Sequence, residues 1–472
     1  MTDTILMLAG KSENTECDDV SAAGMSRIVP VRSRRARMPF SAVCKPSGAA
    51  CNINCAYCFF LSKDLLFDEK SQRMSDDILE QYIREYLAAQ PDGPVEMPWQ
   101  GGEPTLRGVE FFEKVVRLVR RYARPKQRVH QSIQTNATLI DERWCRFLKD
   151  NGFLVGVSID GPAEIHNRYR VNKAGRGTFD LTRRGWEQLQ AAGIETCLLC
   201  TVNSNNSQYP LEVYRFFRDD LKADYIQFIP IVERVPRHYR REAENGWITT
   251  GGERILYQQR GDDVTSRTVS PEAYGEFMVT IFDEWVRHDV GRVSVQQFDS
   301  MMGNYLGRPS LCVHAPVCGD APAVLHNGDV YSCDHFVEPG YRIGNIAEQG
   351  FADMMESGRQ RAFGRTKRDM LPQRCVTCPM LWACNGGCPK DRFVPVTMDD
   401  DGAPVDCDEG AAEIVGRSDN SIDPHPINYL CRGFYRFFSH AAPAIEQMAR
   451  GVVYGRSPES IAWDMREVLC LV

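Results

Sequence analysis

The chain has 472 residues, 43% hydrophobic and 25% charged, which is long enough for two or three domains with hydrophobic cores. A net charge of −7 at pH 7 excludes the basic surface typical of nucleic-acid-binding proteins. Because no apolar segment approaches the roughly 18 residues needed to cross a membrane and no signal peptide is recognisable, we expect a cytoplasmic protein without nucleic-acid or membrane partners.

The first two thirds of the chain alternate between strands and helices. Residues 1–38 are polar and basic, and we expect them to form a solvated leader. Within residues 39–300, helices are expected at 76–90, 107–124, 141–151, 179–192 and 209–220. They separate strands expected at 40–46, 95–99, 130–134, 154–159, 195–201 and 224–231. Six strands in strict alternation with helices predict a parallel sheet, either doubly wound or curved into a barrel.

The remaining segments depart from this alternation. Residues 233–268 are rich in Arg, Glu and Gly and predict an insertion that could border a substrate cleft. A helix is expected at 272–288 and a strand at 293–298. Residues 301–440 contain nine cysteines and little periodicity, which predicts a small domain stabilised by metal rather than by a large core. A helical tail at 441–472 completes the chain.

Eighteen cysteines in a chain expected in a reducing compartment are better explained as metal ligands than as disulfides. The motif Cys51-x3-Cys55-x2-Cys58 follows the first strand directly, where parallel β/α folds place their chemistry. Four cysteines would close a [4Fe–4S] cluster, whereas three leave one iron open to the amino and carboxylate groups of S-adenosylmethionine (SAM). A structural zinc site is the alternative for the motif alone.

Further polar loops follow the next strands. Gln100-Gly101-Gly102-Glu103-Pro104 follows the second strand; its glycines permit close backbone approach to a ligand, and Glu103 could accept a hydrogen bond from an ammonium group. Residues 134–136 follow the third strand, and the segment from Ser158 to Pro162 follows the fourth. Arg170 could pair with a carboxylate, although a surface salt bridge explains it equally well.

These segments resemble the radical SAM superfamily and, in their order along residues 40–438, the anaerobic sulfatase-maturating enzymes. The resemblance implies an α/β fold with a partial (β/α)6 barrel, followed by a cysteine-rich SPASM domain with two auxiliary [4Fe–4S] clusters. With SAM and three clusters in all, such an enzyme oxidises a Cys or Ser residue of an unfolded or nascent sulfatase polypeptide to formylglycine without oxygen. The matching segments are KPSGAACNINCAYCFF, QGGEPTL, QTNATLID, VGVSIDGPAEIHNRYR, HNGDVYSCDHFV, RIGNI and ACNGGCPKDRF.

The resemblance also implies roles for individual residues around SAM. Tyr57 and Ile226 would lie near the adenine, Gly102 near the amino group, and Ser158 and Arg170 around the ribose and carboxylate. Gln100 and Glu103, from the same loop as Gly102, complete the predicted cofactor-binding set.

The downstream cysteines carry a second metal signal. Cys375-x2-Cys378-x5-Cys384-x3-Cys388 has the paired spacing of a metal site, for which a zinc ribbon remains an alternative. Spacing alone does not divide these thiols and the four others between two sites. The resemblance implies one cluster on Cys312, Cys318, Cys333 and Cys388, and another on Cys375, Cys378, Cys384 and Cys431. Cys407 could compete as a ligand, but we expect a free thiol there.

Asp334 directly follows one proposed ligand, Cys333. From its position alone, a hydrogen bond that caps a turn explains it as well as a catalytic role does. The resemblance implies that Asp334 is the base that takes the proton of the substrate thiol or hydroxyl as the second electron leaves. The reaction also needs an electron donor, for which we expect a flavodoxin- or ferredoxin-type protein.

Two other functions fit parts of the sequence. A SPASM-type enzyme could instead crosslink a ribosomal peptide through thioether or carbon–carbon bonds. A zinc-stabilised binding protein without enzyme activity would also contain paired cysteines. The sequence does not decide between Cys and Ser as the substrate residue.

Overall fold

The computed structural model describes residues 33–68, 72–396, 424–457, 460–461 and 464. Most of the predicted leader, much of the predicted tail and Cys407 lie outside this part of the chain. No helix within the described ranges is long and apolar enough to span a membrane.

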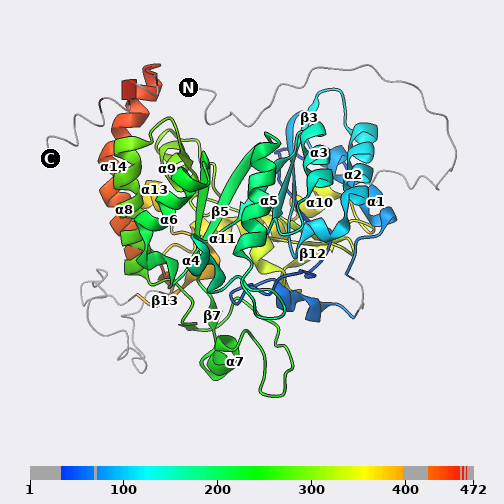
Figure 1. Cartoon of the computed structure of the whole chain (residues 1–472), viewed down its shortest axis with the longest axis horizontal. Coiled ribbons are helices and arrows are strands. Elements are labelled where there is room, and N and C mark those ends of the chain that lie inside the picture. The colour runs from blue at the N-terminus through cyan, green and yellow to red at the C-terminus, as the bar shows by residue number, and fades with distance from the viewer. Residues whose placement is uncertain (1–32, 69–71, 397–423, 458–459, 462–463, 465–472) are drawn as a thin grey trace.

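A single mixed sheet of ten strands organises the molecule (Figure 1). Its centre consists of six parallel strands in chain order, as predicted. A further parallel strand, β9 (Ser294–Val295), pairs with the last of them. The six are β1 (Val43–Lys45), β2 (Gly93–Trp99), β3 (Gln127–Thr135), β4 (Leu154–Ser158), β5 (Thr196–Val202) and β6 (Tyr225–Pro230).

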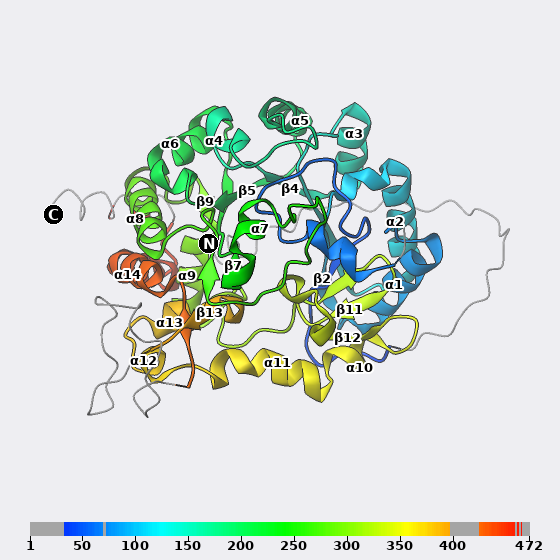
Figure 2. The same ribbon diagram turned by 90° about the horizontal axis from the view of Figure 1, so that it is seen from below.

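Helices cover the outer face of this sheet in an arc (Figure 2). In α2 the apolar residues at helical spacing, among them Phe112 and Val115, are buried, because one stripe of an amphipathic helix faces the sheet. Asp141 caps α3 by accepting a hydrogen bond from Trp144 N. The helices of the arc are α1 (Asp76–Ala89), α2 (Val109–Tyr122), α3 (Glu142–Asp150), α4 (Ala163–Asn167), α5 (Phe179–Ala191), α6 (Pro210–Arg215) and α8 (Pro271–His288).

The cysteine-rich segment extends the same sheet rather than forming a separate layer. Strand β10 (Ala323–Leu325) pairs in parallel with β1, so that Lys45 lies opposite Leu325. The antiparallel strands β11 (Asp329–Tyr331) and β12 (Arg342–Asn345) follow at that edge. This pairing brings residues almost 300 positions apart in the chain to one end of the sheet.

Short helices and one long helix complete the cysteine-rich half. The two-stranded sheet of β13 (Arg392–Val394) and β14 (Ile427–Asn428) lies beside them, and α14 packs along α8. In Figure 2, helices α10 to α13 follow the lower rim, across the molecule from α3 to α6, and α10 contacts α1. The helices are α9 (Gln296–Tyr305), α10 (Phe351–Met355), α11 (Gly358–Asp369), α12 (Gln373–Val376), α13 (Leu381–Cys384) and α14 (Cys431–Val453).

Two segments differ from expectation. The strand predicted at 293–298 is only two residues long, because Gln296 begins α9, whose apolar residues Phe298 and Met301 are buried at helical spacing. The insertion at 233–268 is compact: β7 (Arg234–Val235), α7 (Arg240–Glu244) and β8 (Asp263–Val264) surround a small core of Val235, Ala243, Trp247 and Tyr257.

Candidate active site

A cavity of about 470 Å³ lies at the carboxyl ends of the central strands. Its wall combines four parts of the chain that are far apart in sequence. They are the loop of Cys51, Cys55 and Cys58, the loops after β2 to β4, the insertion with Tyr257 and Gln259, and Asp334 and His335 of the cysteine-rich half. The insertion at 233–268 therefore contributes to the wall of this cavity.

The loop of the first three cysteines is fixed by backbone hydrogen bonds. Asn54 N and Ala56 N donate to the carbonyls of Val171 and Tyr169, and Cys58 N donates to Cys55 O. Asn136 Nδ2 lies 3.8 Å from Cys51 Sγ and donates to Asn52 Oδ1 at 2.9 Å, which ties the loop after β3 to the motif.

The chemistry of these thiols fits an iron–sulfur cluster. Burial, with mutual repulsion of the thiolates, raises the pKa of Cys51 and Cys55 to about 12. Three thiolates held together in this way need a cationic partner to be stable. Across the described ranges, no group of three or more His, Cys, Asp or Glu side chains is arranged to hold a single metal ion. A [4Fe–4S] cluster spreads its thiolate ligands over several irons, so the three sulfurs need not converge on one ion.

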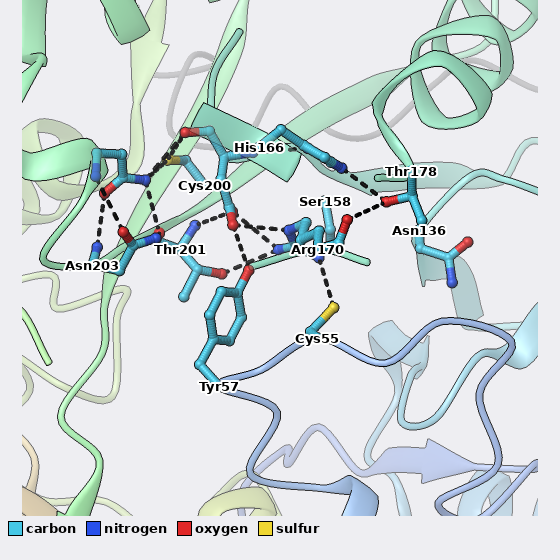
Figure 3. Close-up of polar contacts among 12 residues, drawn as sticks. Cys55, Tyr57, Asn136, Ser158, His166, Arg170, Thr178, Cys200, Thr201 and Asn203 are labelled. Carbon is cyan, nitrogen blue, oxygen red and sulfur yellow. Dashed lines mark hydrogen bonds and ion pairs between the residues drawn. The ribbon is translucent and has the colours of Figure 1, made fainter. Parts of the chain in front are cut away.

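A buried polar network lies beside the cysteine loop, and Figure 3 shows Tyr57, Arg170 and Thr201 of this network near Cys55. Asp160 accepts from all three. Arg170 Nε lies 3.0 Å from Asp160 Oδ2, and Arg170 Nη2 donates to Oδ1 at 3.1 Å. The hydroxyl of Tyr57 donates to Oδ2 at 2.5 Å, and Thr201 N donates to Oδ1 at 3.0 Å. Arg170 is thus in a buried ion pair, which excludes the surface salt bridge, and its Nη1 remains 4.0 Å from Cys55 Sγ.

Asp160 is a site residue that the sequence alone does not identify. Its signal was the Ser-x-Asp-Gly-Pro segment after the fourth strand, which marks a strand end without showing which side chain turns inward. Next to it, His166 is fully buried, with Nε2 3.2 Å from Thr178 Oγ1, and burial lowers its pKa to about 3.

Glu103 links the loops after β2 and β3. Its Oε1 accepts hydrogen bonds from Thr105 N, Thr105 Oγ1 and Thr135 Oγ1 at 3.0, 2.7 and 2.8 Å, and its Oε2 accepts from Asn136 N at 2.8 Å. Four donors already serve this carboxylate, so its observed contacts position the loops. Gly102 is needed for close approach, since a Cβ there would lie 2.2 Å from the carbonyl oxygen of Ala50.

Of the other predicted SAM contacts, the structure brings Gln100 and Ser158 to the cavity but not Ile226. Ser158 Oγ accepts a hydrogen bond from Gln134 Nε2 at 3.0 Å. Side chains alternate between the two faces of a strand, so Ile226 points into the fully buried core, whereas its neighbours Gln227 and Ile229 line the cavity. The prediction for Ile226 therefore placed the contact on the wrong face of β6.

The eight downstream thiols interact electrostatically in two groups of four. One group consists of Cys312, Cys318, Cys333 and Cys388, and the other of Cys375, Cys378, Cys384 and Cys431. Burial raises the pKa of Cys388 to about 11 and that of Cys384 to about 12, so both groups also require a cationic partner. Spacing alone could not have separated the two groups.

Asp334 points at the cavity from the turn after Cys333 and forms an ion pair with a lysine of the opposite wall. Lys45 Nζ lies 2.5 Å from Asp334 Oδ1, and the lysine side chain is 1% exposed. Burial acts to raise the pKa of Asp334, but Lys45, His335 and Lys63 together outweigh it and lower the pKa below its ordinary value. Asp334 is therefore a carboxylate at neutral pH, able to accept a proton.

Comparison with known proteins agrees with this site. The radical SAM superfamily model matches residues 46–217, and the SPASM model, an iron–sulfur cluster-binding domain, matches residues 317–379. The chain is 40% identical over 433 residues to a serine-type anaerobic sulfatase-maturating enzyme of Bacteroides thetaiotaomicron, covering 91% of this chain and 96% of the relative. The chain belongs to the anaerobic sulfatase-maturating enzyme family.

Other members of this family agree in length and fold. A cysteine-type enzyme of Clostridium perfringens is 30% identical over 422 residues, covering 88% of this chain and 99% of that enzyme. A solved structure described as native anSMEcpe with bound AdoMet, another name for SAM, superposes with a TM-score of 0.70 at 30% identity and covers 87% of this chain and all of that one. The chain is a radical SAM enzyme of sulfatase maturation, with iron–sulfur clusters and SAM as cofactors.

Proposed function

We propose that this enzyme oxidises the side chain of one Ser or Cys residue in a sulfatase polypeptide to the aldehyde of formylglycine. The observation that carries the proposal is that one cavity contains both the three-cysteine loop and Asp334. A related structure, described as native anSMEcpe with bound AdoMet and Cp18Cys peptide, matches with a TM-score of 0.70 and supports a peptide substrate. Family membership favours this reaction over peptide crosslinking and over zinc binding without activity.

Cys51, Cys55 and Cys58 would hold the cluster whose open iron binds SAM. When bound, the cluster and SAM supply the 5′-deoxyadenosyl radical that removes a hydrogen atom from the substrate Cβ. Gln100, Gly102, Ser158 and Arg170 would surround SAM, with Tyr57 beside them. Asp160 and Glu103 would position the residues around SAM without contacting it. Asp160 fixes Arg170 and Tyr57, and Glu103 joins the loops after β2 and β3.

Asp334 would accept the proton of the substrate hydroxyl or thiol. Its carboxylate is ionised, lies at the cavity wall, and is held by Lys45 from one side. As the proton moves to Asp334, the second electron would leave the substrate toward the auxiliary clusters. An oxidised Ser is then the aldehyde itself, and an oxidised Cys is a thioaldehyde that water converts to the aldehyde.

The two groups of four thiols would each hold a fully ligated [4Fe–4S] cluster, which gives three clusters in the chain. Full ligation suits electron transfer rather than substrate binding. A flavodoxin- or ferredoxin-type protein would supply the electron that starts each turnover.

The test uses anaerobically reconstituted enzyme with SAM, dithionite and sulfatase-derived peptides that carry either Ser or Cys. A Ser peptide should lose two hydrogens in mass and gain a hydrazide-reactive aldehyde, with 5′-deoxyadenosine formed in parallel. The Asp334→Asn variant should still form deoxyadenosine but little aldehyde. A crosslinked product without aldehyde would overturn the proposal, and so would aldehyde formation by Asp334→Asn at the normal rate.

Serine is the substrate residue that we expect to react faster. The serine-type relative is 40% identical to this chain, whereas the cysteine-type relative is 30% identical over a similar length. Comparison of kcat/KM for the two peptides measures the preference, and a higher value for the Cys peptide would refute it.

A further inference from the structure

Helix α11 presents a row of arginines to solvent at the edge of the cysteine-rich half. Its twelve residues include five cationic side chains and a single acidic one, Asp369, in a chain whose net charge is −7. Arg361, Arg365 and Arg368 are all exposed, and their spacing of four and three residues places them on one face of the helix. Arg365 and Arg368 share Asp369 as their acidic partner, so this face keeps a net positive charge.

The buried side of α11 is attached to the loops of one cysteine group. Lys367 Nζ donates to the carbonyls of Cys312 and Val313 at 2.5 and 2.7 Å. Gly364 lies against the backbone of Cys318, where a Cβ would come within 2.1 Å of the carbonyl oxygen. The arginine row is therefore held rigidly over this cysteine group.

The chain then runs from the arginine row directly into the second cysteine group. Met370 is 46% exposed and Val376 is 54% exposed, and Val376 lies between Cys375 and Cys378 in sequence. Both of these cysteines are half-buried, so two members of the second cysteine group are partly accessible to solvent next to Val376 in the chain. Exposed apolar side chains that follow a row of exposed arginines combine the two features expected for brief docking of a negatively charged partner.

Other basic regions of the surface are neutralised more completely. On α7, Arg240 pairs with Glu244 and Asp263. The groove between α2 and α3 contains four arginines, but Glu113 and Asp150 line it too, and Arg143 pairs with Glu110. Neither region adjoins, in sequence, the three-cysteine loop or the two downstream groups of four cysteines. Position and net charge together single out α11.

We propose that Arg361, Arg365, Arg368, Met370 and Val376 form the docking surface for an acidic one-electron carrier protein. This carrier would exchange electrons with the cluster on Cys375, Cys378, Cys384 and Cys431, so the proposal rests on the proposed function. Substrate oxidation removes two electrons: one leaves with the hydrogen atom taken from Cβ, and the other enters the auxiliary clusters. The docked carrier takes up that second electron and is itself reduced by one electron.

The experiment measures binding of an acidic recombinant flavodoxin to the holoenzyme by calorimetry. We expect binding that weakens by about tenfold or more between low and physiological salt, because exposed charges are screened. The triple variant Arg361→Glu/Arg365→Glu/Arg368→Glu should weaken binding by about 100-fold, because three attractive contacts become repulsive. The triple Gln variant should show a smaller loss of about tenfold.

A matched control reverses Arg117, Arg120 and Arg146 in the groove between α2 and α3 and should bind flavodoxin as the unmodified enzyme does. Turnover with a methyl viologen couple, which both donates the starting electron and accepts the one released to the auxiliary clusters, should be unchanged in the α11 variants, because a small mediator needs no docking surface. Equal flavodoxin affinity in the Glu variant and the unmodified enzyme would overturn the proposal, and so would absent binding by the unmodified enzyme. By contrast, failure of the unmodified enzyme to form aldehyde with dithionite would count against the proposed function and not against the docking surface.

Discussion

Replacement of Lys45 by Met should separate hydrogen abstraction from substrate oxidation. The lysine is held on three sides: its Nζ lies 2.5 Å from Asp334 Oδ1 and 4.1 Å from the centre of the Phe60 ring, and a Cβ at Gly101 would clash with its side chain. Met preserves the length and the packing but removes the charge. Asp334, whose side chain is 17% exposed, then loses its partner and is free to turn away from the substrate.

The size of the effect follows from these contacts. Moving a catalytic group by about 1 Å from its reacting position lowers the rate by about 100-fold. This loss lies within the range of about 100- to 10,000-fold that a general base contributes to the rate. Aldehyde formation by Lys45→Met should therefore fall by about 100-fold, whereas deoxyadenosine formation changes by less than about threefold because SAM binds at other side chains. Loss of one partner of the buried pair should also cost about 3 kcal/mol of stability.

The assay quantifies aldehyde and deoxyadenosine in the same sample, and their ratio is the decisive readout. Lys63→Met is the matched control, because Lys63 is equally buried and lies 3.7 Å from its own acidic partner, Glu338. This control should lose stability but keep the ratio. Lys45→Arg should restore part of the ratio. A parallel fall of both products in Lys45→Met, or an unchanged ratio, would refute the positioning role of Lys45.

Three further changes test the site around SAM. Asp160→Asn leaves Arg170 buried without its counter-charge, so the melting temperature should drop and calorimetry should show SAM affinity reduced by about tenfold; unchanged affinity would contradict the role of Asp160. Gly102→Ala would place a Cβ 2.2 Å from Ala50 O, so iron analysis should find the first cluster depleted while auxiliary iron remains, and full iron content would contradict this. The pKa of His166 is lowered to about 3 in the folded enzyme, so between pH 3 and 6.5 the unfolded state binds more protons. Stability therefore rises with pH in this range. In His166→Gln, the denaturant midpoints at pH 5 and pH 7 should differ less than in the unmodified enzyme.

The existence of the central strands and the residue types of the site follow from the sequence itself, whereas strand spacing does not decide between a doubly wound sheet and a barrel. Alternating apolar segments predict β1 to β6 because strand and helix periodicities are local properties. The motif of Cys51, Cys55 and Cys58, together with the loops after the next strands, predicts the radical-generating loop, because three cysteines leave one iron of a cluster without a protein ligand. Asp334 could be assigned a role only through a resemblance that spans both halves of the chain.

Tertiary structure decided which distant groups meet. The pairing of β10 with β1 is non-local, so no pattern in the sequence predicts that Lys45 contacts Asp334. The grouping of the eight downstream thiols, the Asp160 network and the inward face of β6 depend on how loops and strands turn in space. A shift of one residue reverses the face of a strand, so Gln227 and Ile229 line the cavity whereas Ile226, assigned to SAM through the resemblance, is buried on the other face. The local motifs could be predicted from the sequence, whereas the contacts between these motifs depend on the tertiary structure.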